Sequence, residues 1–116
     1  MKILTSTEEE VIVLRLVGPM RSEDQNEFKK VMVEITGKGH NKVALDMSKV
    51  DFIDSSCLGI LIWSMKNLRQ RGGDLKMFSL APYISEVFTI TRLDSCFTVT
   101  GTLEEAITDF AKPKEP

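Results

Sequence analysis

The stretch Asp51-Phe52-Ile53-Asp54-Ser55-Ser56-Cys57-Leu58-Gly59 joins a short apolar segment to a long amphipathic one. Residues 42–47 before it are mostly apolar, which is typical of a buried strand. After it, apolar residues recur at helical spacing, at Leu58, Leu61, Ile62, Met65 and Leu68. The chain is therefore predicted to turn here from a strand into a helix. Loops at such junctions often carry binding residues.

Three polar residues, Asp54, Ser55 and Ser56, stand where the helix is predicted to begin. Asp and Ser are favoured at this position because their side-chain oxygens accept the unpaired backbone N–H groups of the first turn. One such residue is enough. Capping therefore explains Asp54 or Ser55, with Ser55 better placed than Ser56, and it leaves the second hydroxyl without a structural role.

A helical wheel adds a direction to the Ser56 hydroxyl. At 100° per residue, Ser56, Ile60, Trp63 and Asn67 share one face, roughly opposite the stripe that contains Leu61. The hydroxyl is thus predicted to point outward beside the only tryptophan of the chain. This pattern fits a partner-binding face, and it fits equally well a few isolated exposed apolar residues, which are common on protein surfaces.

Residues 50–59, together with the strand before them, resemble the signature of bacterial anti-sigma-factor antagonists, the STAS domains of the sporulation and stress-response type. The family pattern is a strand, then Asp-Ser-Ser-Gly-Leu-Gly, then a helix. The resemblance extends over nearly the whole chain in length and element order, but only this loop is specific. It implies that the second serine, here Ser56, is phosphorylated by a cognate anti-sigma factor that is also a serine kinase. It also implies a PP2C-type phosphatase as a second partner.

Combined with the wheel, the resemblance predicts a partner-binding surface that consists of Asp54, Ser55, Ser56, Cys57, Ile60 and Trp63. Two residues depart from the family pattern. Cys57 stands where Gly is usual, a change that a helix tolerates because Cys is the better helix former. Arg21, in Gly18-Pro19-Met20-Arg21, stands where many members have an acidic residue, and this change bears on the choice of partner.

The composition sets limits on the class of protein. A chain of 116 residues with 42% hydrophobic residues fits one domain, predicted over residues 1–111, followed by a flexible tail over residues 112–116. No apolar run is long enough to insert into a membrane, and Glu8-Glu9-Glu10 interrupts any signal-like segment, so a cytoplasmic protein is expected. The net charge of -2 disfavours binding to nucleic acid.

The remaining pattern predicts an α/β fold with a mixed sheet of about four to five strands and about four helices, and the resemblance implies a single STAS-like domain. A capping box at Ser22-Glu23-Asp24-Gln25 is expected to open the first helix, and Pro82 the third. The other predicted elements are strands at residues 2–5, 11–17, 75–78 and 96–99 and a last helix through Phe110.

The residues that enzymes need are scarce. His40 is the only histidine, and it enters the central strand at the end opposite Ser56, so a Ser-His or Cys-His enzyme is disfavoured. Cys57 could act as a phosphocysteine or redox thiol at a helix N-terminus, although packing in the core is the simpler role. We therefore expect a binding protein without catalytic activity.

Metal and cofactor sites are not expected either. Cys57 and Cys96 lack metal-ligand spacing, and no Gly-rich phosphate loop occurs. Asp46, Asp51 and Asp54 near the end of the central strand leave open a magnesium site of the receiver type. That reading is the weaker one because such a site would also need acids where the chain has Gly18 to Arg21.

The resemblance thus implies a phosphorylation switch that, when unphosphorylated, binds an anti-sigma factor and frees the sigma factor. The alternative keeps the fold and removes the switch. STAS domains also serve as accessory subunits of lipid-transport machinery and as scaffold parts of stress-signalling complexes.

Overall fold

A five-stranded sheet forms the centre of the computed structural model, which describes residues 1–112. Its strands follow in chain order: β1 (Lys2–Glu8), β2 (Val11–Val17), β3 (Lys42–Lys49), β4 (Asp74–Phe78) and β5 (Thr98–Thr100). β1 and β2 form an antiparallel hairpin, and every later neighbour pairs in parallel. The sheet is therefore mixed, as predicted.

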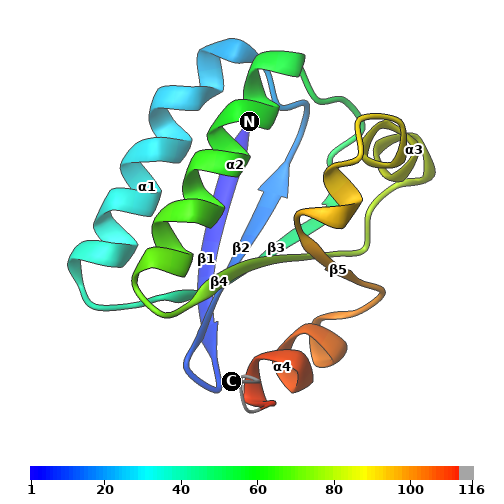
Figure 1. Ribbon diagram of the computed structural model, residues 1–116. Helices are drawn as coiled ribbons and strands as arrows, with labels where there is room; N and C mark the ends of the chain where they lie inside the picture. The colour runs from blue at the N-terminus through cyan, green and yellow to red at the C-terminus, as the bar shows by residue number, and fades with distance from the viewer. Residues whose placement is uncertain (113–116) are drawn as a thin grey trace.

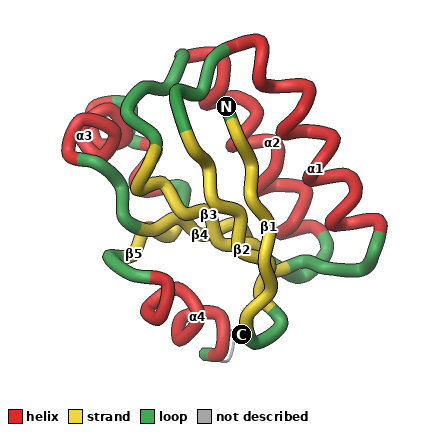
Figure 2. Tube along the Cα trace, turned by 180° about the vertical axis from the view of Figure 1, so that it is seen from behind, coloured by secondary structure: helices red, strands yellow, loops and turns green. Residues whose placement is uncertain are grey.

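Four α-helices connect and cover the strands: α1 (Gln25–Gly37), α2 (Ser55–Gln70), α3 (Pro82–Ile90) and α4 (Leu103–Ala111). α1 and α2 lie side by side on one face of the sheet, whereas α4 lies on the other (Figures 1 and 2). The short 3-10 turns η1 (Ser22–Asp24) and η2 (Leu93–Ser95) precede α1 and follow α3. The predicted α/β class, strand number and helix number are confirmed.

The core has two parts because β2, β3 and β4 are covered on both faces. The larger part lies between the sheet and helices α1, α2 and α3, and includes the fully buried Leu14, Phe28, Leu61 and Phe88. The smaller part lies under α4, around Val13 and Ala106. The near-continuous apolar run of β2 is thus explained, since successive side chains enter opposite cores.

Several predicted boundaries were wrong. β1 continues to Glu8, beyond the predicted end at Thr5, and β5 covers residues 98–100, two positions later at its start than predicted. Ser22 does not open a capping box with Gln25. Instead, Asp24 reaches back, and its Oδ2 accepts the backbone N–H of Arg21 at 2.8 Å. Of the predicted tail, residues 113–116 lie outside the described residues.

The turn between β1 and β2 places two glutamates in the left-handed region, Glu9 at φ 47° and Glu10 at φ 69°. Asn-Gly suits such a two-residue hairpin turn far better, because L-residues with a Cβ are strained there. We expect Glu9→Asn combined with Glu10→Gly to raise the free energy of unfolding by about 1–2 kcal/mol. Urea denaturation measures the change. Glu9→Gln with Glu10→Gln is the control, since it removes both charges and keeps the strain; an equal gain there would assign the effect to charge.

Candidate functional site

Asp54 opens α2 and holds Ser56 in place. Asp54 is the N-cap residue, in extended conformation (φ -70°, ψ 142°), and its Oδ1 accepts the backbone N–H of Ser56 at 2.9 Å. The same oxygen accepts the hydroxyl of Ser56 at 2.8 Å. One carboxylate therefore caps the helix and also fixes the hydroxyl rotor of the serine.

These hydrogen bonds also set the charge of the site. The N–H and the hydroxyl of Ser56, helped by the positive charge of Arg21, hold the pKa of Asp54 below its usual value. Asp54 therefore remains a carboxylate at neutral pH. The Ser56 hydroxyl faces a fixed acceptor, and a second negative group at this position would meet its charge.

The sequence left Asp54 and Ser55 open as the residue that caps the helix, and the structure selects Asp54. Asp54 is the cap, and Ser55 is an exposed residue of the first turn. Ser56 is exposed as well, as the wheel predicts. The difference between the two serines is that only the Ser56 hydroxyl is oriented by a hydrogen bond to Asp54.

Cys57 faces the interior. Its side chain is fully buried, and its Sγ donates to the backbone oxygen of Met20 at 3.5 Å. Burial raises the pKa of the thiol, and the negative charges of Asp54 and Asp24 raise it further. The predicted partner contact of Cys57 is therefore corrected, because its side chain does not reach the surface. The same burial argues against a reactive thiol.

The loop after β2 is fastened to the loop after β3. Met20 and Ile53 form an isolated parallel bridge, in which Met20 N–H donates to Phe52 oxygen and Asp54 N–H donates to Met20 oxygen, each at 2.9 Å. The start of α2 is thus held by backbone from a distant part of the sequence. The bridge brings Arg21, the residue after Met20, next to the site.

Arg21 belongs to the site and was not among the predicted site residues. Its guanidinium carbon lies 5.4 Å from the centre of the Phe52 ring, an arrangement typical of a cation–π contact. Its charge also acts on Asp54. The only signal in the sequence was its departure from the acidic residue that is usual in the family pattern at this position.

Ile60 and Trp63 are less exposed than predicted. Both are half-buried and pack against the main core. Lys29 of α1 lies over the Trp63 ring, with its Nζ 5.1 Å from the ring centre. The face that the wheel predicted for Ser56, Ile60 and Trp63 is therefore not uniformly exposed. Its first turn, with Ser56, is exposed to solvent, whereas the following turns lie against α1.

Trp63→Ala is expected to reduce the free energy of unfolding by about 2 kcal/mol. Full burial of a tryptophan would give about 3–5 kcal/mol, and Trp63 is only half-buried. Urea denaturation of the variant measures the loss. Trp63→Phe is the matched control, because it keeps a ring beside Lys29 and should recover much of the stability. A change below 0.5 kcal/mol would mean that the ring does not support the fold.

The predicted alternatives to a binding site find little support. Asp46 is buried, and although burial opposes its ionisation, hydrogen bonds from Ser48 and the ion pair with Arg15 (3.2 Å) keep its pKa low. Within residues 1–112, no three His, Cys, Asp or Glu side chains come close enough together to hold a metal ion. Asp46, Asp51 and Asp54 therefore do not form the cluster that the alternative of a receiver-type magnesium site would need. His40 lies before β3 and Ser56 after it, so the two do not meet.

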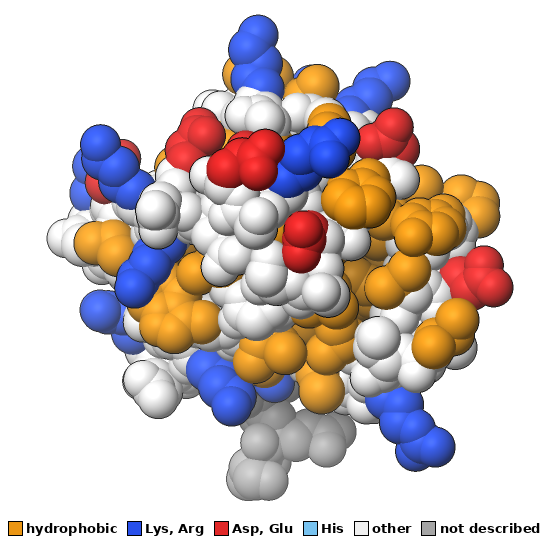
Figure 3. Space-filling model, turned by 90° about the horizontal axis from the view of Figure 1, so that it is seen from above, with side chains coloured by type: hydrophobic (Ala, Val, Ile, Leu, Met, Phe, Trp, Pro, Cys, Tyr) orange, Lys and Arg blue, Asp and Glu red, His pale blue; other side chains and the backbone are white. Residues whose placement is uncertain are grey.

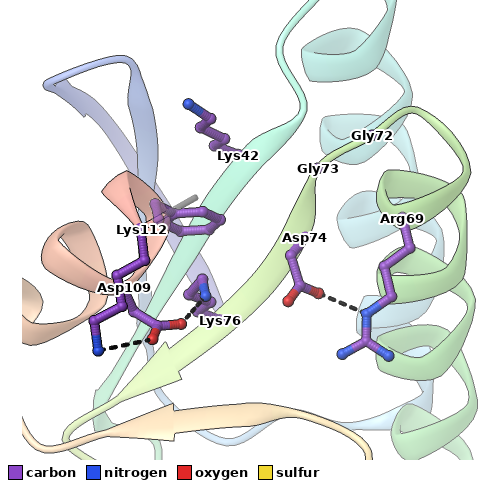
Figure 4. Close-up of a pocket in the computed structure, with 9 residues that line it drawn as sticks. Lys42, Arg69, Gly72, Gly73, Asp74, Lys76, Asp109 and Lys112 are labelled. Carbon is purple, nitrogen blue, oxygen red and sulfur yellow. Dashed lines mark hydrogen bonds and ion pairs between the residues drawn. The ribbon is translucent and has the colours of Figure 1, made fainter. Parts of the chain in front are cut away.

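A pocket of about 330 Å³ lies at the end of the sheet away from Ser56, where β3 and β4 begin (Figure 4). Its charged side chains are largely paired with one another. Asp109 of α4 pairs with the buried Lys76 of β4, and Arg69 pairs with Asp74 at 2.8 Å. Lys76 also lies 4.5 Å from the centre of the Phe110 ring. The Lys76 contacts fasten α4 to β4, and the Arg69–Asp74 pair joins α2 to β4, which together account for the charged lining.

Exposed apolar side chains occur on the same side of the sheet as Ser56. Phe52 is 38% exposed, and Tyr83 and Ile90 of α3 are 55% and 74% exposed. Viewed from above, hydrophobic side chains gather toward the right, the side on which α3 lies, next to a group of acidic and basic side chains (Figure 3). This edge therefore offers both charge and apolar area.

None of the helices within residues 1–112 is long and apolar enough to span a membrane.

Comparison with known proteins agrees with this geometry. The family model described as STAS domain matches residues 2–106. The candidate anti-sigma factor antagonist BtrV of Bordetella bronchiseptica is 29% identical over 110 residues, which cover 95% of each chain. A crystal structure of a candidate anti-sigma factor antagonist from Thermotoga maritima has a TM-score of 0.89 at 26% identity, over 95% of each chain.

The anti-sigma factor antagonist SpoIIAA was solved in unphosphorylated and phosphorylated forms, which match with TM-scores of 0.80 and 0.71. The first match covers 98% of this chain and 100% of the other, the second 93% and 98%. At 21% identity, both establish the fold alone. From the family model, which covers nearly the whole chain, and from relatives named anti-sigma factor antagonists, it follows that this chain belongs to the STAS domain family.

Proposed function

We propose that this chain is an anti-sigma-factor antagonist switched by phosphorylation of Ser56. In the unphosphorylated form it binds an anti-sigma factor that is also a serine kinase, so that the sigma factor is released and transcription changes. A PP2C-type phosphatase restores the active form. The proposal assigns the chain a binding role without catalysis, in the bacterial cytoplasm where sigma factors act.

The observation that carries the proposal is the state of the Ser56 hydroxyl. It is exposed, stands in the first turn of α2, and is oriented by the carboxylate of Asp54 at 2.8 Å. In the transfer step, Ser56 Oγ forms a bond to the γ-phosphorus of ATP while the bond between that phosphorus and the bridging oxygen breaks. ADP leaves, and the hydroxyl proton passes to a base. An exposed and oriented hydroxyl suits this in-line attack.

The surface around Ser56 supports a role in binding. Asp54, Ser55 and Ser56 are at least partly exposed in the first turn of α2, next to the apolar Phe52. Cys57 is left out of the proposed contact surface because it is buried, and Ile60 and Trp63 contribute at most the exposed parts of their side chains. The partner is therefore expected to bind the N-terminal end of α2 more than its length.

Ser56→Ala is expected to abolish phosphorylation. The purified chain is incubated with the candidate kinase and ATP, and the phosphorylated residue is located by mass spectrometry. Ser55→Ala is the matched control: it removes the neighbouring exposed hydroxyl, keeps Asp54 and Ser56, and should be labelled as well as the wild type. Phosphate found mainly on Ser55 would refute the assignment. A chain that binds its partner but accepts no phosphate would be the non-switching scaffold or accessory subunit.

A further inference from the structure

Arg21 lies close enough for its charge to act on Asp54, the residue that holds Ser56, because two loops are held together by backbone hydrogen bonds. Gly18 N–H donates to Lys49 oxygen at 3.0 Å, and the bridge between Met20 and Ile53 continues the contact. These bonds join the ends of β2 and β3, which are parallel neighbours. The position of the Arg21 backbone relative to α2 is thus fixed by the sheet and does not depend on a flexible loop.

The guanidinium of Arg21 is available for a new partner. Arg21 is exposed, and its side chain rests on the Phe52 ring, with 5.4 Å between the guanidinium carbon and the ring centre. Among residues 1–112 it forms no salt bridge. A cation–π contact on an exposed ring is a weak interaction, which a nearby anion can readily replace.

Phosphorylation of Ser56 would create such an anion next to an existing one. A phosphoserine carries about -1.5 to -2 charges, and its bridging oxygen would be the atom that now lies 2.8 Å from Asp54 Oδ1. The N-terminus of α2 offsets part of this repulsion. Asp24 adds further negative charge to the region, although its Oδ1 is paired with the N-terminal amine at 3.3 Å. Arg21 is the cation whose charge already reaches Asp54.

We propose that Arg21 leaves the Phe52 ring and pairs with the phosphate of phosphorylated Ser56. The planar guanidinium can donate two parallel hydrogen bonds to phosphate oxygens. The pair between Arg21 and the phosphate stabilises the phosphorylated form of this chain. An acidic residue at position 21 would instead repel the phosphate. The pairing also uncovers the Phe52 ring, so phosphorylation changes two adjoining parts of the surface. This inference rests on the proposed function, because it concerns the phosphorylated state of the same site.

The test uses phosphoserine installed at position 56 by genetic encoding, so no kinase is needed. Thermal unfolding midpoints are measured for the phosphorylated and unphosphorylated forms of the wild type, Arg21→Gln, Arg21→Lys and Arg71→Gln. Phosphorylation should lower the midpoint of Arg21→Gln by about 4 °C more than that of the wild type. Arg21→Lys, which keeps the charge without the planar fork, should lie between them.

Arg71→Gln is the matched control. Arg71 is an exposed arginine at the other end of α2, about 22 Å from Ser56 at 1.5 Å per residue, and its Nε donates to Asn67. In Arg71→Gln, phosphorylation of Ser56 should change the thermal unfolding midpoint by the same amount as in the wild type. A second readout is the ¹H–¹⁵N signal of the Arg21 Nε–H group, which should move on phosphorylation when the guanidinium pairs with phosphate.

Equal midpoint shifts in the wild type and Arg21→Gln, with an unmoved Arg21 Nε–H signal, would overturn the proposal. An equal loss in Arg71→Gln would overturn it too, because net charge alone would then explain the effect. These results are independent of the proposed function. If a cognate kinase does not label Ser56, the switch fails, whereas the pairing is judged on the encoded phosphoserine alone.

Discussion

Ser56→Asp is expected to weaken binding to the anti-sigma partner about a hundredfold while the fold stays intact. A loss of about 2.8 kcal/mol at the interface gives that factor. The variant replaces an exposed hydroxyl with a charge next to Asp54, on the surface where the partner is proposed to bind. The N-terminus of α2 tolerates the new charge, so the free energy of unfolding should change by less than about 0.5 kcal/mol. Titration calorimetry and urea denaturation measure the two quantities.

Ser55→Asp separates position from charge. It adds the same charge one residue earlier, also in the exposed first turn of α2, but leaves the Ser56 hydroxyl bound to Asp54. We expect it to weaken binding clearly less than Ser56→Asp. If both variants lose affinity equally, the partner senses the overall charge of this edge. If Ser56→Asp unfolds the protein, Ser56 is a structural residue and the switch has no physical basis.

The fold could be predicted because its signals are local. The apolar run of β2 and the helical spacing after Ser56 each lie within a few residues, and both elements were placed correctly. The strands predicted at residues 2–5 and 11–17 leave a connection between them, but Glu9 and Glu10 suit a hairpin turn poorly and gave no signal of where the chain turns. The end of β1 was missed because the polar Ser6, Thr7 and Glu8 give no strand signal of their own, although they pair with β2 in register.

The site could be predicted only in part, because its parts come from distant segments. The helical wheel correctly predicted that Ser56 points outward. It takes no account of neighbouring helices, so it predicted Trp63 to be more exposed than it is beside Lys29 of α1. The cap was ambiguous because Asp54 and Ser55 are both good capping residues. Arg21 could not be placed next to α2, since the bridge between Met20 and Ile53 is a long-range contact that no local pattern encodes.

Gly73→Ala is expected to produce the largest loss of stability. Gly73 packs against the backbone where β4 begins, and a Cβ there would lie 1.7 Å from Asn41 oxygen and 2.5 Å from its carbonyl carbon. Backbone on both sides would have to move. The same oxygen accepts the N–H of Asp74 at 3.0 Å, so the shift would also disturb the start of the pairing between β3 and β4. We expect a loss of about 3 kcal/mol or more.

Two other glycines provide matched controls for Gly73→Ala. Gly72→Ala has open space apart from an Asn41 side-chain contact at 3.9 Å, but its φ of +81° makes an alanine costly by about 1 kcal/mol. Gly59→Ala lies inside α2 with nothing within 4 Å, so it should stabilise the protein by about 0.5–1 kcal/mol. Urea denaturation of the three variants should therefore give a large loss, a small loss and a gain. If Gly73→Ala loses no more than Gly72→Ala, the strands adapt to the Cβ, and the close approach of Asn41 does not hold this edge of the sheet.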